Sequence, residues 1–546
     1  MKLLVLTFIV SNLFAQTSML NPGKRGNGYR VWVYFDERDQ ENYIDLDPAS
    51  IKRRQKHGIN KTTKYDYKIK QYYLDALKKT GVKLKNKSRW LNAVSVIANK
   101  DQISLIEKLT FVSSIRPVYQ HKKKKAIQSV ADNDQTRDFD YGESLGQIEQ
   151  INCKTAHIAG YYGQGVRVLY LDTGYELNHS AYDSLNLVAE YDFINNDTNT
   201  ANETAQEVSD NQDDHGTICL SVMAGYAPGN LIGPAFKSEY LLAKTEIMAE
   251  EIQQEEDNYV AALEWGESLG AEVACASLGY LDWYTYQDLD GNTATTTIAI
   301  DIASSLGVLC VNSAGNEGDD PWYYIITPAD ADSVLSVGAV GQNGEIALFS
   351  SHGPTIDGRI KPEVCALGVS TYCVRSNTQN DYRNASGTSF SAPLAAGAAA
   401  VILSANSSWT NMQVREALMM TASRNSNPDN SYGYGIINTW DAINYQSTVA
   451  TENDIIISNS VKISNAFPNP FNPLISLSIE GSLTETFINV NIYDVRGNLV
   501  NQLYNGIISN KKMDLLWNGN KHSNGIYIIR ARWDGGSHFQ KATLLK

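Results

Sequence analysis

The sequence lacks several features that mark common classes of protein. It has no excess of positive charge, because 46 Lys and Arg stand against 60 Asp and Glu, for a net charge of −14. This balance argues against nucleic acid as the main partner. After residue 15 no apolar run reaches membrane-spanning length, so we expect no transmembrane segment. Asp-Thr-Gly occurs once, whereas aspartic proteases need two such carboxylates, and that class is therefore excluded for a single chain.

Cysteine is also scarce. The six cysteines all lie between Cys153 and Cys373. An exported protein can form disulfides, but the number of cysteines does not fix a pairing. Cys275 and Cys310 lie in apolar, strand-like runs and are expected to be buried thiols. Cys365 and Cys373 are the first pair to test as a disulfide.

The N-terminus carries a targeting pattern followed by a basic segment. Met1–Ala15 has one Lys, an apolar stretch and a small residue before Gln16, which is typical of a cleaved secretory signal over residues 1–15. Residues 24–125 hold 25 Lys and Arg against 10 Asp and Glu, a balance of +15, so the remainder carries −29. This split fits two parts that attract each other, or simply two differently charged domains.

Changes of pattern along the chain indicate three folded parts. Residues 27–120 interleave strands and helices and predict a small α+β domain, and residues 121–145 read as a linker open to proteolytic processing. Residues 146–446 alternate β and α segments. Residues 447–465 form a second linker, and residues 466–546 hold short strands separated by turn signals, which predicts a β-sandwich.

The alternating region predicts a doubly wound α/β domain with a mostly parallel sheet. Active sites in such sheets lie outside the carboxyl ends of the strands. Continuous apolar runs mark its buried strands. They are Val166–Leu171, Tyr240–Ala243, Glu272–Ser277, Val308–Asn312 and Val334–Val340, with helices at Gly216–Gly225, Asp257–Leu269 and Thr295–Leu306.

Asn384–Ala400 is the most distinctive stretch of this domain, with turn-forming residues followed by the small residues of a closely packed helix. Ser389 is expected at the helix N-terminus, where free backbone N–H groups favour a developing negative charge. Pro393 is expected in the first turn of the helix. Taken alone, the stretch fits a capped, buried helix as well as it fits a site for a nucleophilic hydroxyl.

A nucleophilic Ser389 needs a base and a group that orients the base. Asp172 ends the first buried strand, His215 begins a helix, and Asn316 follows another buried strand as an amide donor. Each residue alone has an ordinary structural explanation, since turns and loop histidines are common. Together, at one edge of one sheet, they predict a nucleophilic site.

The order Asp, His, Asn, Ser resembles that of the subtilisin-like serine proteases, the subtilase superfamily. The resemblance implies that Ser389 attacks the scissile carbonyl, that His215 transfers its proton, and that Asp172 orients His215. It implies that Asn316 and the Ser389 N–H bind the oxyanion. The matching motifs are Asp172-Thr173-Gly174, His215-Gly216-Thr217, Ser277-Leu278-Gly279, Ala314-Gly315-Asn316-Glu317-Gly318 and Gly387-Thr388-Ser389 with Ser391 and Pro393.

The same resemblance implies which residues form the walls of the substrate cleft. It also implies a preference for substrates with an apolar or aromatic side chain before the scissile bond. Asp319–Ile326, which is rich in aromatic residues, leaves the shape of the specificity pocket open. Cys219, one turn after His215, implies sensitivity to mercurials. By this resemblance, the edge strand that pairs with substrate is formed by Ser277, Leu278 and Gly279. The opposite wall of the specificity pocket is formed by Ser313, Ala314 and Gly315.

No metal ligand set or required cofactor is identified in the sequence. Structural calcium is common in the family, but its sites are not recognisable here. The acidic loop Asn195–Asp214 is either a calcium loop or a solvated loop.

The flanking parts carry resemblances of their own. The segment around Ser88–Ala93 resembles bacterial propeptides of this family, which implies a folding chaperone and temporary intramolecular inhibitor. The C-terminal part resembles the type A sorting domain of the type IX secretion system. That implies a Bacteroidetes-like Gram-negative bacterium, export through the periplasm to the surface or medium by that machinery, and removal of the domain. The matches are Phe467–Pro473, Ile492–Asp494 with Gly497, Trp517–Gly519, Gly525–Tyr527 and Leu544–Lys546.

The sequence therefore predicts a secreted serine endopeptidase made as an inhibited precursor, with proteins or peptides as substrates. The alternative is a surface-displayed binding protein or adhesin on an inactive subtilase scaffold. That alternative requires the loss of at least one catalytic position, and all four are present.

Overall fold

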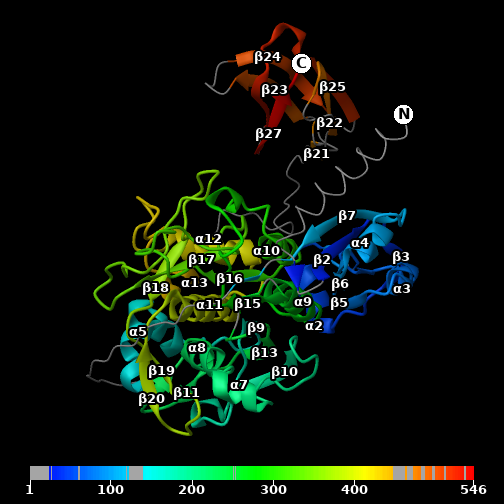
Figure 1. Ribbon diagram of the computed structural model, residues 1–546. Helices are drawn as coiled ribbons and strands as arrows, with labels where there is room; N and C mark the ends of the chain where they lie inside the picture. Colours follow the sequence, from blue (N-terminus) through cyan, green and yellow to red (C-terminus); the bar gives the residue numbers. More distant parts are fainter. Residues whose placement is uncertain are drawn as a thin grey trace. The chain divides into compact units, whose positions relative to one another are not determined.

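The structure is a computed structural model of the chain (Figure 1). It describes residues 24–25, 28–59, 62–118, 120–121, 139–249, 251–252, 254–446, 462–463, 466, 471–480, 486–494, 499–508, 512–533 and 536–546. Contacts divide the chain into two units, residues 1–450 and 451–546. The expected signal over residues 1–15 and most of both expected linkers lie outside the described residues.

The central domain, residues 139–446, is built on a sheet of seven parallel strands in the part of the chain that the structure describes. The strand order is β10-β13-β9-β15-β16-β17-β18. The first strand, β9, lies inside the sheet and later strands add on both sides of it, so the expected doubly wound α/β fold is confirmed. The bounds are β9 Arg167–Asp172, β10 Asn186–Asp192, β13 Glu239–Lys244, β15 Val273–Ala276, β16 Leu309–Ser313, β17 Leu335–Val340 and β18 Val364–Leu367.

Helices cover both faces of this sheet (Figure 1). Side chains of β9 alternate between two cores, as the two-residue period of a strand requires. Val168 and Tyr170 face α8 (Asp214–Ala224) and α11 (Thr388–Ala405). Leu169 and Leu171 face α9 (Gln254–Ser268) and α10 (Thr295–Ser305). Shorter helices complete the domain: α5 Leu145–Gln150, α6 Cys153–Ile158, α7 Ala205–Asp210, α12 Asn411–Met420 and α13 Thr439–Ile443.

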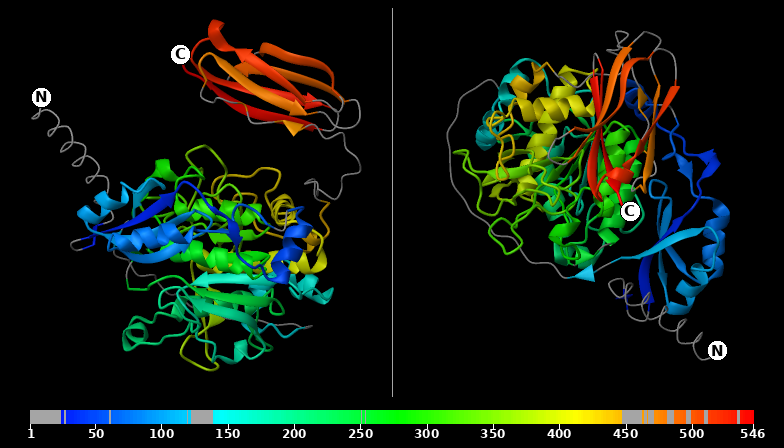
Figure 2. Two further views of the ribbon diagram at one scale, coloured as in Figure 1. Left: turned by 90° about the vertical axis from the view of Figure 1, so that its right-hand side faces the viewer. Right: turned by 90° about the horizontal axis from the view of Figure 1, so that it is seen from above.

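The N-terminal domain, residues 24–121, is the expected α+β domain. An antiparallel sheet runs in the order β1-β2-β6-β5. Strand β7 also pairs with β2, along the edge that faces away from β6. Helices pack on the sheet, and the whole lies beside α9 of the central domain (Figure 1, Figure 2). The bounds are β1 Lys24–Arg25, β2 Gly28–Phe35, β3 Asp39–Tyr43, α2 Pro48–Lys56, β4 Tyr67–Lys68, α3 Gln71–Lys79, β5 Lys83–Ser88, β6 Ala93–Ala98, α4 Lys100–Ile106, β7 Val112–Pro117 and β8 Gln120–His121.

The C-terminal domain consists of two antiparallel sheets around one apolar core, in agreement with the expected β-sandwich. One sheet has the order β21-β22-β25 and the other β24-β23-β26-β27. The core includes Ile475, Ile488 and Trp517. The bounds are β21 Lys462–Ile463, β22 Leu474–Glu480, β23 Thr486–Asp494, β24 Leu499–Ile508, β25 Lys512–Asn518, β26 Gly525–Trp533 and β27 Gly536–Leu544.

The expected disulfide between Cys365 and Cys373 is wrong. All six cysteines are described, and all are buried free thiols, so Cys365 and Cys373 do not pair. Their sulfurs face backbone carbonyls instead, at 3.5 Å from Tyr432 O and 3.4 Å from Arg383 O respectively. Among the described residues, α11 is long and apolar enough to cross a membrane, but 89% of it is buried inside the central domain. It is a core helix.

Candidate active site

Ser389 lies at the start of α11, as expected, and its backbone anchors to a neighbouring strand end. The helix begins at Thr388, so Pro393 is its sixth residue and not in the first turn. Proline has no N–H to donate to the carbonyl four residues earlier, which is that of Ser389. That carbonyl instead accepts a hydrogen bond from Ser277 Oγ at 2.7 Å. Pro393 therefore frees the carbonyl that ties Ser389 to the end of β15.

Asp172 and His215 meet at the carboxyl end of β9. His215 Nδ1 lies 2.7 Å from Asp172 Oδ1, and the Asp172 side chain is fully buried while that of His215 is 27% exposed. The backbone N–H of Thr173 also donates to Asp172 Oδ1, at 2.7 Å. Gly216 allows this approach, since a Cβ there would lie 2.3 Å from the carbonyl oxygen of Gly174. The carboxylate thus holds the imidazole ring by Nδ1, and Nε2, on the opposite side of the ring, remains for contact with another group.

The electrostatics of His215 follow from its two neighbours. Burial alone would lower the pKa of His215, but the negative charge of Asp172 and the nearby Cys219 outweigh it and raise the pKa well above its usual range. Cys219 Sγ lies 3.7 Å from His215 Nε2, one helical turn along α8. Burial raises the pKa of the Cys219 thiol itself. The imidazolium form of His215 is therefore strongly stabilised at this site.

Among the described residues, no hydrogen bond joins Ser389 to His215. Ser389 Oγ donates to the carbonyl oxygen of Ser277 at 3.2 Å, and its side chain is almost completely buried. Ser277 Oγ lies against Cys219 and within 3.0 Å of Tyr170 Oη. Ser277 thus contacts both Ser389 and Cys219, the residue whose sulfur lies beside His215. The expected contact between Asp172 and His215 is present, and the expected contact between His215 and Ser389 is not.

Asn316 is positioned to donate a hydrogen bond beside Ser389. Its Oδ1 accepts from Thr388 N at 2.9 Å and from Thr388 Oγ1 at 3.1 Å, which directs the amide nitrogen away from these donors. The Asn316 side chain is exposed. Gly387, with φ +150°, leads the chain past Asn316 into the helix. An oriented amide donor next to a helix N-terminus is suited to binding an oxyanion.

The two expected walls lie at the carboxyl ends of neighbouring strands. Ser277, Leu278 and Gly279 follow β15, while Ser313 ends β16 and is followed by Ala314 and Gly315. The walls are joined directly, because Ser313 Oγ donates to Leu278 O at 3.3 Å. Beneath them, Asn312 Nδ2 donates to Leu278 O at 2.8 Å. The two segments are thus held at a fixed separation.

The aromatic residues of Asp319–Ile326 lie outside the space between these walls. Trp322 and Tyr324 pack in a separate apolar cluster with Tyr286, whose ring stacks on that of Tyr324 at 4.0 Å. Tyr323 stacks on His352 at 4.5 Å and is 44% exposed. The cluster of Trp322 and Tyr324 also includes Ala314, so these rings pack against one of the two walls.

The acidic loop contains a buried ion pair. Lys244 Nζ lies 2.9 Å from Asp192 Oδ2 and 2.7 Å from Glu207 Oε1, and the Lys244 side chain is fully buried. Asp192, Asp197 and Glu203 also bring carboxylate oxygens within 4.8 Å of one another. Lys244 therefore already supplies a positive charge to this cluster.

The N-terminal domain packs along α9 of the central domain, where Ser88 Oγ donates to Glu264 Oε1 at 2.5 Å, and contacts at two further places extend this interface. The first is a strand pairing: β8 runs antiparallel to β14 (Glu251–Ile252), with Gln120 opposite Ile252 and His121 opposite Glu251. Nearby, the buried Arg30 Nη2 lies 2.9 Å from Asp257 Oδ2 of α9. Strand β8 of the N-terminal domain thus pairs with a strand at the edge of the central domain.

The second place is the C-terminal end of α9 and α10, where α2 docks. All five N–H groups of Arg53 are bonded there. Nε donates to Leu306 O at 3.1 Å, Nη1 to Glu267 O at 3.1 Å and Ala271 O at 2.7 Å, and Nη2 to Ser50 Oγ at 3.0 Å and the Glu267 carboxylate. Each helix is followed by a glycine that α2 covers, since a Cβ on Gly270 would lie 2.5 Å from Ala49 Cβ and one on Gly307 would lie 2.7 Å from His57 Nδ1.

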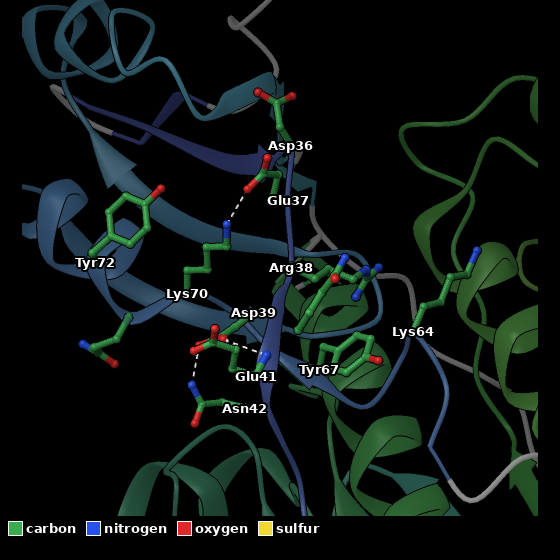
Figure 3. A pocket seen from close by; sticks show the side chains of 12 residues that line it. Asp36, Glu37, Arg38, Asp39, Glu41, Asn42, Lys64, Tyr67, Lys70 and Tyr72 are labelled. Atoms are coloured by element: carbon green, nitrogen blue, oxygen red, sulfur yellow. Dashed lines mark hydrogen bonds and ion pairs between the residues drawn. The ribbon is translucent and has the colours of Figure 1, made fainter.

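Other polar features have structural roles. His157 is buried between Tyr141 Oη and Pro234 O, each 2.8 Å away, and burial lowers its pKa to about 4. A hollow of about 900 Å³ lies in the N-terminal domain (Figure 3). Its Glu37 and Lys70 pair with each other, and Asn42 Nδ2 donates to Asp39 at 2.9 Å. Several of the polar groups that line this hollow are therefore bonded to one another.

Comparison with known proteins agrees with this arrangement. The sequence model of the Subtilase family matches residues 163–435, that of the Bacteroidota peptidase S8 propeptide domain matches residues 30–134, and that of the secretion system C-terminal sorting domain matches residues 465–544. Subtilisin E of Bacillus subtilis is 29% identical over 366 residues, 67% of this chain and 84% of its own. Subtilisin BL of Lederbergia lenta is 30% identical over 292 residues, 53% of this chain and 95% of its own.

These matches define the class as a serine-type endopeptidase with a propeptide and a secretion sorting domain. The subtilase match covers half of the chain, and the chain therefore belongs to the subtilase family. Its sorting domain and its Bacteroidota-type propeptide indicate export to the medium or the cell surface in that bacterial group.

Proposed function

We propose that the chain hydrolyses peptide bonds through Asp172, His215 and Ser389 and an acyl-enzyme intermediate. The observation that carries this proposal is the 2.7 Å contact between Asp172 Oδ1 and His215 Nδ1, at the sheet edge where α11 presents Ser389. The alternative, a binding protein on an inactive scaffold, has no support from these positions. The chemistry needs no cofactor, because nucleophile, base and oxyanion donors all come from the chain.

In the proposed reaction, Ser389 Oγ turns from Ser277 O to His215 Nε2 when substrate enters. His215 accepts the hydroxyl proton as Oγ forms a bond to the scissile carbonyl carbon. The resulting oxyanion accepts hydrogen bonds from the Ser389 N–H and from Asn316 Nδ2. His215 then gives its proton to the leaving amine, the C–N bond breaks, and an acyl-enzyme remains. Water attacks this ester with His215 again as base, and Ser389 is regenerated.

Asp172 acts through His215. Its bond to Nδ1 fixes the ring so that Nε2 carries the lone pair, and its charge stabilises the imidazolium that forms in each step. The raised pKa of His215 is the ground-state sign of that stabilisation. The Asp172 carboxylate also accepts the Thr173 N–H, a hydrogen bond that favours its charged form.

The N-terminal domain is proposed to inhibit the enzyme before processing. The support is its strand β8, which pairs with β14 at the edge of the domain that carries the active site. A backbone added as a strand occupies the N–H and C=O groups of β14, so that no other peptide can pair with them. We further propose passage through the periplasm and recognition of the C-terminal domain by the type IX secretion machinery, with removal of that domain after export.

The test uses purified precursor refolded away from other proteases. Ser389→Ala is expected to keep its N-terminal domain attached, as measured by intact mass over time. Ser404→Ala, at the far end of the same helix, is the matched control and is expected to process like the unmodified chain. Processing of Ser389→Ala at the normal rate would contradict the proposal.

A further inference from the structure

One side chain lies between the two walls of the substrate cleft. The segment that carries it, residues 325–327, bonds to one wall and to the residue directly after the other: Ile326 N donates to Ala314 O at 3.1 Å, and Tyr280 N donates to Thr327 O at 2.7 Å. Thr327 N returns a bond to Tyr280 O at 3.1 Å. The backbone of Ile326 is therefore fixed across the gap and cannot shift to make room.

The glycines of the two walls show where the Ile326 side chain goes. A Cβ added to Gly279 would lie 2.4 Å from Ile326 Cδ1, and one added to Gly315 would lie 3.0 Å from Ile326 Cγ1. The side chain thus contacts both walls at once, with 9% of the residue exposed. The neighbouring Ile325 points elsewhere, into the cluster of Trp322 and Tyr324.

We propose that Ile326 sets the depth of the specificity pocket and restricts it to substrates with a small side chain, glycine, alanine or serine, before the scissile bond. This inference rests on the proposed endopeptidase function. A large apolar or aromatic side chain between these walls must displace Ile326, and forcing extra methylene groups into packed space is unfavourable. The preference is therefore opposite to the apolar or aromatic leaning that the family resemblance implies.

The experiment compares peptide p-nitroanilides that differ only in alanine or phenylalanine before the scissile bond, with processed enzyme. The unmodified enzyme is expected to show a higher kcat/KM for alanine. Ile326→Gly opens the space, and we expect its kcat/KM for phenylalanine to rise at least about tenfold relative to alanine. Ile326→Val, a smaller change, is expected to move the ratio in the same direction by less.

Ile325→Val is the matched control, because it removes the same methyl group one residue away, and it is expected to leave the ratio unchanged. Titration with a phosphonofluoridate counts the folded active sites of each variant, so that a low rate caused by poor folding is not mistaken for a change in specificity. A preference for phenylalanine in the unmodified enzyme, or an unchanged ratio in both Ile326 variants, would overturn the inference. Failure of the unmodified enzyme to label or to cleave either peptide would instead refute the endopeptidase proposal.

Discussion

Arg53 offers the sharpest perturbation of the inhibited state. Four of its five N–H groups bond to the central domain, to three carbonyls at the ends of α9 and α10 and to the Glu267 carboxylate. Both side chains are almost completely buried, at 1% and 0% exposure. Arg53→Gln removes the charge and leaves two side-chain N–H groups in place of five. Arg54 still contacts Glu267, at 2.9 Å.

Because Arg54 still pairs with Glu267, the cost is that of leaving buried carbonyl acceptors without their donors, about 1–3 kcal/mol. At about 1.4 kcal/mol for each factor of ten, the cleaved N-terminal domain should bind roughly 5- to 150-fold more weakly. The assay isolates the processed complex, dilutes it, and follows the rate at which activity on a chromogenic peptide appears. The substituted residue leaves with the N-terminal domain, so the final activity per active site is expected to be unchanged.

Lys52→Gln is the matched control for Arg53→Gln, since it removes a positive charge from the exposed face of the same helix. Release from this variant is expected at the normal rate. If the Arg53→Gln precursor processes poorly, amide hydrogen exchange of α2 in the intact Ser389→Ala chain gives the same comparison. Equal release rates, or equal exchange, for Arg53→Gln and Lys52→Gln would refute the reasoning.

Three further predictions concern the active site. Because the pKa of His215 is raised and the base must be neutral, kcat/KM should rise with pH through a midpoint above about 6.5, and Asp172→Asn should lower that midpoint; a pH profile measures both. Asn316→Ala should lower kcat roughly 100- to 1,000-fold with little change in KM, as steady-state kinetics would show. A mercurial should inhibit the enzyme by binding Cys219 beside His215, and Cys219→Ser should be resistant; an inhibition titration that is identical for both would contradict this.

Much of the fold and of the site could be predicted from the sequence. Buried parallel strands are continuous apolar runs, which is why β9 and β17 were expected close to their observed bounds. The edge strand β10 has no continuous apolar run to mark it, because most of its residues are half-buried or exposed. The short strand β18 was also missed, although all four of its residues are buried. In the N-terminal domain, α3 ends at Lys79 because Gly81, with φ +82°, follows it and leads into the lysine-rich β5.

The parts of the site that the sequence did not show depend on contacts between distant residues. The register of α11 decides that Pro393 frees the Ser389 carbonyl, and only the fold brings Ser277 to it. Ile326 looks like an ordinary apolar residue until Gly279 and Gly315 are seen on either side of it. The adjacent basic residues of α2 give no local sign that Arg53 is buried.

The most direct measurement of the central claim is labelling of the processed enzyme with a phosphonofluoridate probe, followed by mass spectrometry of the labelled peptide. The proposed mechanism predicts one label per chain, attached to Ser389, and none on the Ser389→Ala chain. Absence of labelling on the processed enzyme, or equal labelling of the Ser389→Ala chain, would contradict the assignment of Ser389 as the nucleophile.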